Sequence, residues 1–165
     1  MRILVMGSGG LGGYFGARLA LGGASVAFVA RGAHLEAMRR HGLRIEGPEP
    51  LHVPQVEAVE SPPAAAPYDL VIFAVKLWDT TEALRLIGPA VGPQTTVISF
   101  QNGVLKDEDL RAAFGPARIM GGVGYVATTI DRPGVIRQTG PMQRLIFGEF
   151  DGTRSQRAEA FLKPA

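Results

Sequence analysis

The feature that most constrains this chain is a glycine-rich turn close to its N-terminus. The apolar run Arg2–Met6 leads directly into six residues with the spacing G-x-G-x-x-G, namely Gly7-Ser8-Gly9-Gly10-Leu11-Gly12. A short apolar run that stops at glycine is typical of a buried strand. The residues after the turn change to helical spacing, with Leu11, Phe15 and Leu19 on one face. A glycine turn between a strand and a helix is the context in which this motif binds a dinucleotide.

Each glycine of the turn has a separate expected role. Gly7 permits the tight turn, Gly9 lets the backbone approach a pyrophosphate, and Gly12 lets the helix pack close to the strand. Free N–H groups at the helix start would then bind the anion, assisted by the helix dipole. We therefore predict that the whole segment binds the cofactor: Gly7, Ser8, Gly9, Gly10, Leu11 and Gly12.

The rest of the chain repeats the alternation of strand and helix. The first helix, Gly10–Leu21, ends at Gly22-Gly23, and Ser25–Val29 follows as a second buried strand. Such a βαβ unit requires a right-handed crossover. We expect an α/β fold of the Rossmann type, a doubly wound and mainly parallel sheet with a short antiparallel extension near the C-terminus.

Further elements are predicted from apolar runs and helical spacing. The expected strands are Gly42–Ile45, Leu51–Val59, Leu70–Val75, Thr96–Phe100 and Arg118–Val126. Leu70–Val75 is apolar throughout, so it should be central and covered on both faces. Two antiparallel strands, Gly134–Thr139 and Arg144–Phe150, should flank a Gly-Pro turn. The expected helices are Ala33–Arg40, Thr80–Leu86, Lys106–Phe114 and one from Arg154 to Leu162 that Lys163-Pro164-Ala165 ends, and Ser61–Pro67 should be a loop.

Composition restricts the possible classes of function. Of the 165 residues 46% are hydrophobic and 19% charged, which indicates one folded domain with a proper core. No apolar run reaches the roughly 18–20 residues that span a bilayer, so no membrane segment is expected. The chain has no cysteine, which excludes disulfides and a cysteine-rich zinc site. Basic residues form no stripe with interleaved aromatics, so nucleic acid is not an expected partner. A cytoplasmic location is the default expectation.

The end of the second strand distinguishes between the two nicotinamide dinucleotides. An NAD site usually places Asp or Glu there to accept hydrogen bonds from the ribose. This chain instead has Ala30-Arg31-Gly32. A carboxylate would repel a 2′-phosphate, whereas a guanidinium binds it through charge-assisted hydrogen bonds. We therefore predict NADP(H) as the cofactor and Arg31 as its 2′-phosphate ligand, the alternative being a solvated loop arginine.

Polar residues also follow two later strands. Lys76 comes after the apolar run Leu70–Val75, and Gln101-Asn102-Gly103 comes after Thr96–Phe100. Ligands of doubly wound sheets lie across the carboxyl ends of the strands. Lys76 could meet a phosphate or a substrate carboxylate, and Asn102 could bind the nicotinamide ribose. The residues alone leave a non-functional alternative open for each of them. Lys76 could be a strand-end lysine that reaches water, and Asn102 could belong to an Asn-Gly turn pair.

Taken together, these segments resemble the ketopantoate reductase (2-dehydropantoate 2-reductase) family along essentially the whole chain. The matching segments are Ile3–Gly12, Arg31, Gly42–Ile45, Ala74-Val75-Lys76, Gln101-Asn102-Gly103, Gly121–Val123 leading to Ala127, Pro133–Ile136, Thr139-Gly140 and Ile146–Gly148. The resemblance implies an NADPH-dependent reductase of a 2-oxo acid. It also implies that the Gly7–Gly12 segment, Arg31, Lys76, Asn102 and Ala127 contact the cofactor, Ala127 mainly through its backbone.

The chain departs from that family at its C-terminal end. The family has a second, helical domain that supplies the catalytic lysine, whereas this sequence reaches only Ala165. We accordingly expect residues 1–165 to form one NADP(H)-binding domain with no catalytic residue of its own, and Lys163 is not assigned that role. The isolated chain should bind NADPH and reduce ketopantoate slowly or not at all. The face that packs on the second domain should be apolar, so self-association is expected.

Other functions remain open at this point. The chain could be a non-catalytic NADP-binding module, such as a sensor or a subunit that another chain completes. It could also be the NADP half of another 2-oxo acid reductase, or a relative of the 6-phosphogluconate and hydroxyacyl dehydrogenases, which share the first βαβ unit. The Gln101-Asn102-Gly103 segment favours the ketopantoate group. His34, His41 and His52 match no functional position of the family and are interpreted as surface or satisfied core residues.

Overall fold

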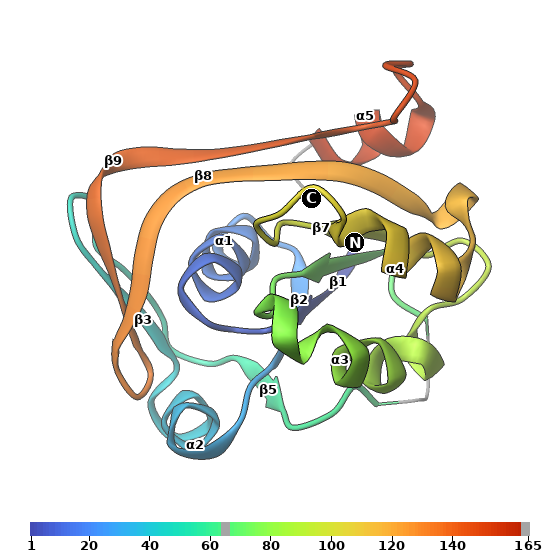
Figure 1. Ribbon diagram of the computed structural model, residues 1–165. Helices are drawn as coiled ribbons and strands as arrows, with labels where there is room; N and C mark the ends of the chain where they lie inside the picture. Colours follow the sequence, from blue (N-terminus) through green and yellow to red (C-terminus); the bar gives the residue numbers. More distant parts are fainter. Residues whose placement is uncertain (64–66, 163–165) are drawn as a thin grey trace.

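The computed structural model describes residues 1–63 and 67–162 (Figure 1). The helices are α1 (Gly10–Leu21), α2 (Gly32–His41), α3 (Thr80–Ile87), α4 (Lys106–Phe114) and α5 (Gln156–Leu162). The strands are β1 (Arg2–Met6), β2 (Ser25–Val29), β3 (Leu43–Glu46), β4 (Leu51–Val53), β5 (Glu57–Val59), β6 (Leu70–Phe73), β7 (Thr96–Ser99), β8 (Ile119–Arg132) and β9 (Val135–Gly148). The expected Arg2–Met6, Gly10–Leu21, Ser25–Val29 and Lys106–Phe114 are confirmed with the same bounds.

One sheet joins the strands in the order β4-β3-β9-β8-β7-β6-β1-β2-β5. The pairs β1–β2, β1–β6, β6–β7 and β2–β5 are parallel, and β8 begins parallel to β7. The chain moves outward from β1 in both directions, to β2 on one side and to β6 on the other. This arrangement confirms the doubly wound α/β fold and puts the switch point between β1 and β6, where such sheets bind ligands.

Side-chain alternation along the central strands divides the core in two. Ile3 and Val5 of β1 pack into one hydrophobic cluster, with α1 and α2, whereas Leu4 and Met6 pack into the other, with α3 and α4. All four residues of β6 are buried. The prediction that this uninterrupted apolar run is a central strand covered on both faces is therefore confirmed.

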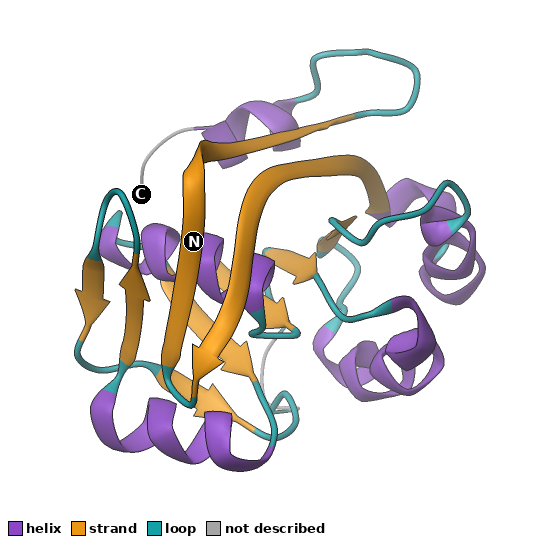
Figure 2. Cartoon of the chain, turned by 60° about the vertical axis from the view of Figure 1, so that its left-hand side comes forward, coloured by secondary structure: helices purple, strands orange, loops and turns teal. Residues whose placement is uncertain are grey.

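The long strands β8 and β9 curve around α1, which lies between them and the parallel strands (Figures 1 and 2). Tyr14 of α1 is fully buried, and its hydroxyl donates to Gln143 Oε1 of β9 at 2.8 Å. A Cβ atom on Gly13 would overlap with the side chain of Ile136, also on β9. The glycine-rich face of α1 thus lets the helix pack closely against the hairpin formed by β8 and β9. This hairpin covers the first βαβ unit.

The expected single strand Leu51–Val59 is wrong. The structure contains two short strands, and they lie at opposite edges of the sheet: β4 pairs antiparallel with β3, and β5 pairs parallel with β2. Pro54 separates them. Proline has no N–H for a ladder, so an apolar run that contains it rarely continues as one strand.

The expected pair of strands around Gly140-Pro141 is also wrong. The reversal occurs instead at Gly134 (φ +75°), and β9 runs on through Gly140 as the antiparallel partner of β8. Residues 139–142 form a bulge opposite Ala127, because the pairing passes from Thr128–Gln138 to Val126–Gln143. Pro141 is tolerated there since a bulge requires no ladder N–H from it.

The other predicted elements are confirmed with small changes at their ends. The expected strand Arg118–Val126 extends to Arg132, and only Ile119 and Met120 pair parallel with β7. Part of the expected loop Ser61–Pro67, and Lys163-Pro164-Ala165, lie outside the described residues. No helix among the described residues is long and apolar enough to cross a membrane.

Candidate dinucleotide-binding site

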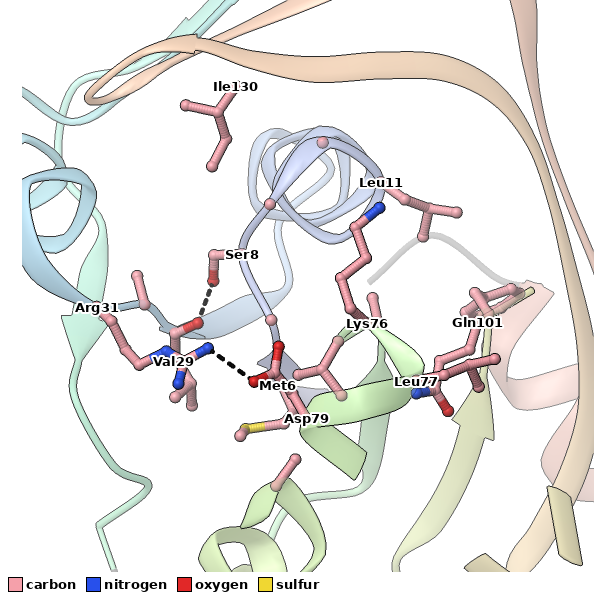
Figure 3. A pocket seen from close by; sticks show the side chains of 18 of the residues that line it. Met6, Ser8, Leu11, Val29, Arg31, Lys76, Leu77, Asp79, Gln101 and Ile130 are labelled. Atoms are coloured by element: carbon pink, nitrogen blue, oxygen red, sulfur yellow. Dashed lines mark hydrogen bonds and ion pairs between the residues drawn. The ribbon is translucent and has the colours of Figure 1, made fainter. Parts of the chain in front are cut away.

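A cavity of about 720 Å³ opens at the carboxyl ends of β1, β2, β6 and β7 (Figure 3). Its wall contains the predicted residues Gly7, Ser8, Gly9, Gly10, Leu11, Arg31, Lys76 and Asn102. This volume lies in the range of cofactor and ligand sites. The fold therefore brings together, at one edge of the sheet, residues that lie up to 95 positions apart in the sequence.

The glycine turn is fixed by bonds to the second strand. Ser8 donates from both its N–H (3.0 Å) and its hydroxyl (2.9 Å) to the carbonyl of Val29, at the end of β2. Gly7 has φ +97°, a conformation that L side chains rarely adopt. A Cβ there would also meet the Val75 nitrogen at 2.8 Å. The turn is thus hydrogen-bonded to β2 and closely packed at Gly7, and the Ser8 hydroxyl faces β2.

Of the other glycines in the turn, Gly9 borders open space, whereas Gly10 and Gly12 are closely packed. Gly9 is the N-cap of α1, and a Cβ built on it would have nothing within 4 Å, so its backbone borders open space. The first N–H groups of a helix have no partner within the helix and bind anions. A Cβ on Gly12 would instead overlap with the Gly7 carbonyl oxygen, and one on Gly10 with that of Thr128. Gly9 is therefore suited to ligand approach and Gly12 to packing.

His34 ties this turn to the β8–β9 hairpin. Its Nε2 lies 2.9 Å from the Ser8 carbonyl, and the Gly134 N–H donates to its Nδ1 at 3.1 Å. These partners require the neutral ring with the proton on Nε2. Burial lowers the pKa of His34, which favours that neutral form. Both ring nitrogens of His34 have hydrogen-bond partners, as expected for a satisfied core residue. The side chain also lines the cavity, which the sequence did not indicate.

Arg31 lies at the end of β2 and points across the cavity mouth towards the start of α3 (Figure 3). Its Nη2 is 3.3 Å from Asp79 Oδ1, and its Nη1 is 3.8 Å from Glu82 Oε2. The Arg31 side chain is 65% exposed, so it is accessible to a ligand. Sequence reasoning missed both carboxylates, because they belong to a segment about 50 residues away and not to the strand end where an acid was sought.

Lys76 follows β6, as predicted, and extends across the cavity towards the start of α1 (Figure 3). It precedes a short 3-10 turn, Leu77–Asp79, that leads into α3. Trp78 in this turn lines the cavity and is 82% exposed. The lysine thus presents a positive charge at the same opening as the glycine turn.

A buried amide holds the loop that carries Asn102. Gln101 donates from Nε2 to Thr80 Oγ1 at 2.9 Å and accepts from the Ser99 hydroxyl at 3.1 Å. These bonds join the end of β7 to the first residue of α3, and so fix Asn102 relative to the segment that contains Lys76. Asn102 and Gly103 lie in a bend, in which Gly103 has φ +112°.

Two of the ten predicted site residues do not line the cavity. Gly12 supports the turn from behind, as its packing role requires. Ala127 lies at the bulge of the hairpin, and its neighbours Val126 and Thr128 line the cavity instead. Among the described residues, no group of three or more His, Asp or Glu side chains could hold a metal ion.

A glycine turn at the switch point of a doubly wound sheet, with basic and amide groups lining the same cavity, is typical of a nucleotide-binding α/β protein. The comparison with known families agrees with that class. The family model described as ketopantoate reductase PanE/ApbA matches residues 3–152, so the chain belongs to this family.

Individual relatives support the assignment. The chain is 37% identical over 179 residues to a 2-dehydropantoate 2-reductase of Mesorhizobium japonicum, covering 95% of this chain and 54% of that protein. It is 32% identical over 160 residues to an uncharacterized oxidoreductase, YkpB, of Bacillus subtilis, covering 97% and 52%. The crystal structure of 2-dehydropantoate 2-reductase from Geobacter metallireducens superposes with a TM-score of 0.89 at 33% identity, covering 98% and 53%. The chain spans about half the length of these relatives.

Proposed function

We propose that residues 1–165 form the NADP(H)-binding domain of a 2-dehydropantoate 2-reductase, which reduces ketopantoate to pantoate. The observation that carries the proposal is the position of Arg31 at the carboxyl end of β2, beside the glycine turn. In this fold the end of the second strand meets the adenosine ribose. An accessible guanidinium there matches a 2′-phosphate in charge and hydrogen-bonding geometry. A cytoplasmic location, where such a metabolic reductase would act, is part of the same proposal.

The remaining site residues fit the other parts of the cofactor. The free N–H groups at the start of α1 suit the pyrophosphate. Lys76 and Asn102 lie further along the same cavity and would bind the ribose and nicotinamide end, next to a small 2-oxo acid. Ala127 would contribute backbone contacts through the bulge. A bound NADPH supplies the hydride for reduction of the 2-oxo group, whereas the chain's own residues hold and orient it.

The test of this proposal is a titration of wild type and Arg31→Ala with NADPH and NADH. Loss of a charged hydrogen bond should weaken NADPH binding by about 1.5–3 kcal/mol and leave NADH binding nearly unchanged. Arg40→Ala is the matched control, because it removes the same charge from an exposed position of α2 that does not line the cavity. Equal losses for both cofactors in Arg31→Ala would contradict the assignment.

We also propose that the exposed apolar residues beside the cavity favour self-association. Four of them lie on the segments that carry Lys76 and Asn102: Leu77, Trp78, Val104 and Leu105. Val104 is 94% exposed, and large apolar side chains left exposed in one region commonly mark an interface. Light scattering over a concentration series should show a mass that rises above that of one chain. A mass that stays at one chain at the highest concentrations would contradict this.

A further inference from the structure

The adenosine end of the cavity holds a carboxylate that the second strand lacks. Asp79 comes from the 3-10 turn between β6 and α3, and it lines the same cavity as Arg31. Asp79 forms an ion pair with Arg31 (Figure 3). Its Oδ1 is 3.3 Å from the Arg31 Nη2, and its side chain is 25% exposed. The end of β2 lacks the acid that an NAD site usually presents there, but an acid from another element lies beside Arg31.

The position of Asp79 opposes the role proposed for Arg31. A 2′-phosphate that binds the guanidinium must displace this carboxylate or lie beside it, and like charges that close repel strongly at a partly desolvated site. The 2′-hydroxyl of NADH carries no charge and can donate a hydrogen bond to a carboxylate. One residue would therefore weaken NADPH binding and support NADH binding.

The neighbouring acids are less suited to this effect. Glu82 approaches Arg31 only to 3.8 Å and its side chain is 58% exposed, so water and salt screen it more. Glu60 lines the cavity, but within the described residues it forms no ion pair with Arg31. Asp79 is at once the nearest and the most buried of the three carboxylates around the guanidinium.

We propose, on the basis of the NADP(H) function above, that Asp79 is a specificity-determining residue that narrows the preference of this site for NADPH over NADH. Asp79 is the N-cap residue of α3, but its side chain makes no capping hydrogen bond. Asparagine has nearly the same shape and is an equally good N-cap. The substitution Asp79→Asn therefore removes the charge, and with it the ion pair to Arg31, while it keeps the shape of the side chain.

The experiment measures Kd for NADPH and NADH in wild type, Asp79→Asn, Glu82→Gln and Arg31→Ala. In Asp79→Asn the affinity for NADPH should rise by about ten-fold at low salt, that for NADH should fall by about three-fold, and the melting temperature should stay within about 2 °C. The gain should shrink as salt is added, because screening weakens the repulsion. Glu82→Gln should produce the same change on a smaller scale. Glu36→Gln is the control, since it removes an exposed acid of α2 that does not line the cavity.

The outcomes separate this inference from the proposed function. One outcome is that Arg31→Ala selectively weakens NADPH binding but Asp79→Asn leaves the ratio of NADPH affinity to NADH affinity unchanged or lowers it. The inference about Asp79 is then wrong and the NADP(H) assignment stands. If Arg31→Ala affects both cofactors equally, or wild type binds neither, both are wrong.

Discussion

Gly9→Ala should fold like the wild type and lose most of its affinity for the dinucleotide. The backbone of Gly9 has φ −75°, which alanine adopts readily, and the added methyl group would meet nothing within 4 Å. That open space is where a pyrophosphate would approach the free N–H groups of α1. Loss of one charged hydrogen bond costs about 1.5–3 kcal/mol, so the Kd for NADPH should rise by roughly 10–150-fold.

Two measurements on Gly9→Ala are needed together. Thermal unfolding should give a melting temperature within about 2 °C of wild type, because the substitution creates no steric overlap. Calorimetric titration should show the loss of NADPH affinity, and NADH should lose a similar factor, because both cofactors carry the pyrophosphate. Affinities within about three-fold of wild type, which is less than 1 kcal/mol, would show that the ligand does not approach Gly9.

Gly12→Ala should damage the fold itself. A Cβ at this position would overlap with the carbonyl oxygen of Gly7, and it would lie 3.0 Å from the Val5 side chain and 3.2 Å from that of Ala74. The first obstacle is the backbone of the glycine turn, which cannot rotate away as a side chain can. Overpacking of this kind costs about 1–3 kcal/mol and sometimes more.

For a domain of this size that destabilisation corresponds to a melting temperature lower by about 3–12 °C. NADPH binding should fall as well, because relief of the overlap moves Gly7. Gly9→Ala, three residues away in the same turn, is the matched control and should keep its stability. A Gly12→Ala variant as stable as Gly9→Ala would mean that α1 does not pack on the turn as the structure describes.

The first βαβ unit could be predicted from sequence because its signals are local. A strand ending in glycine, a helical pattern from Gly10 and a second apolar run at Ser25 each specify their own element, and all three bounds agree with the structure. The same locality explains the error at Gly140-Pro141. This pair is a common turn signal, but here it lies in a bulge of a long strand that its pairing with β8 stabilises.

The site could be predicted only where its residues follow strand ends. Arg31, Lys76 and Asn102 were found because parallel strands bring their carboxyl ends to one edge. Asp79 and His34 could not be found in that way. Asp79 reaches Arg31 through the turn before α3, and His34 acquires its role only because Gly134 comes within 3.1 Å of it. Both depend on contacts between distant segments that no local pattern encodes.

The most direct test of the account is a titration of the unmodified chain with NADPH and with NADH. Trp78 is the single tryptophan and lines the cavity, so energy transfer from it to the reduced nicotinamide reports binding without a label. We predict saturable binding of one NADPH per chain, several-fold tighter than NADH, with a preference that requires Arg31. Absence of saturable binding, or NADH bound as tightly as NADPH, would contradict the claim that this glycine turn and Arg31 form an NADP(H) site.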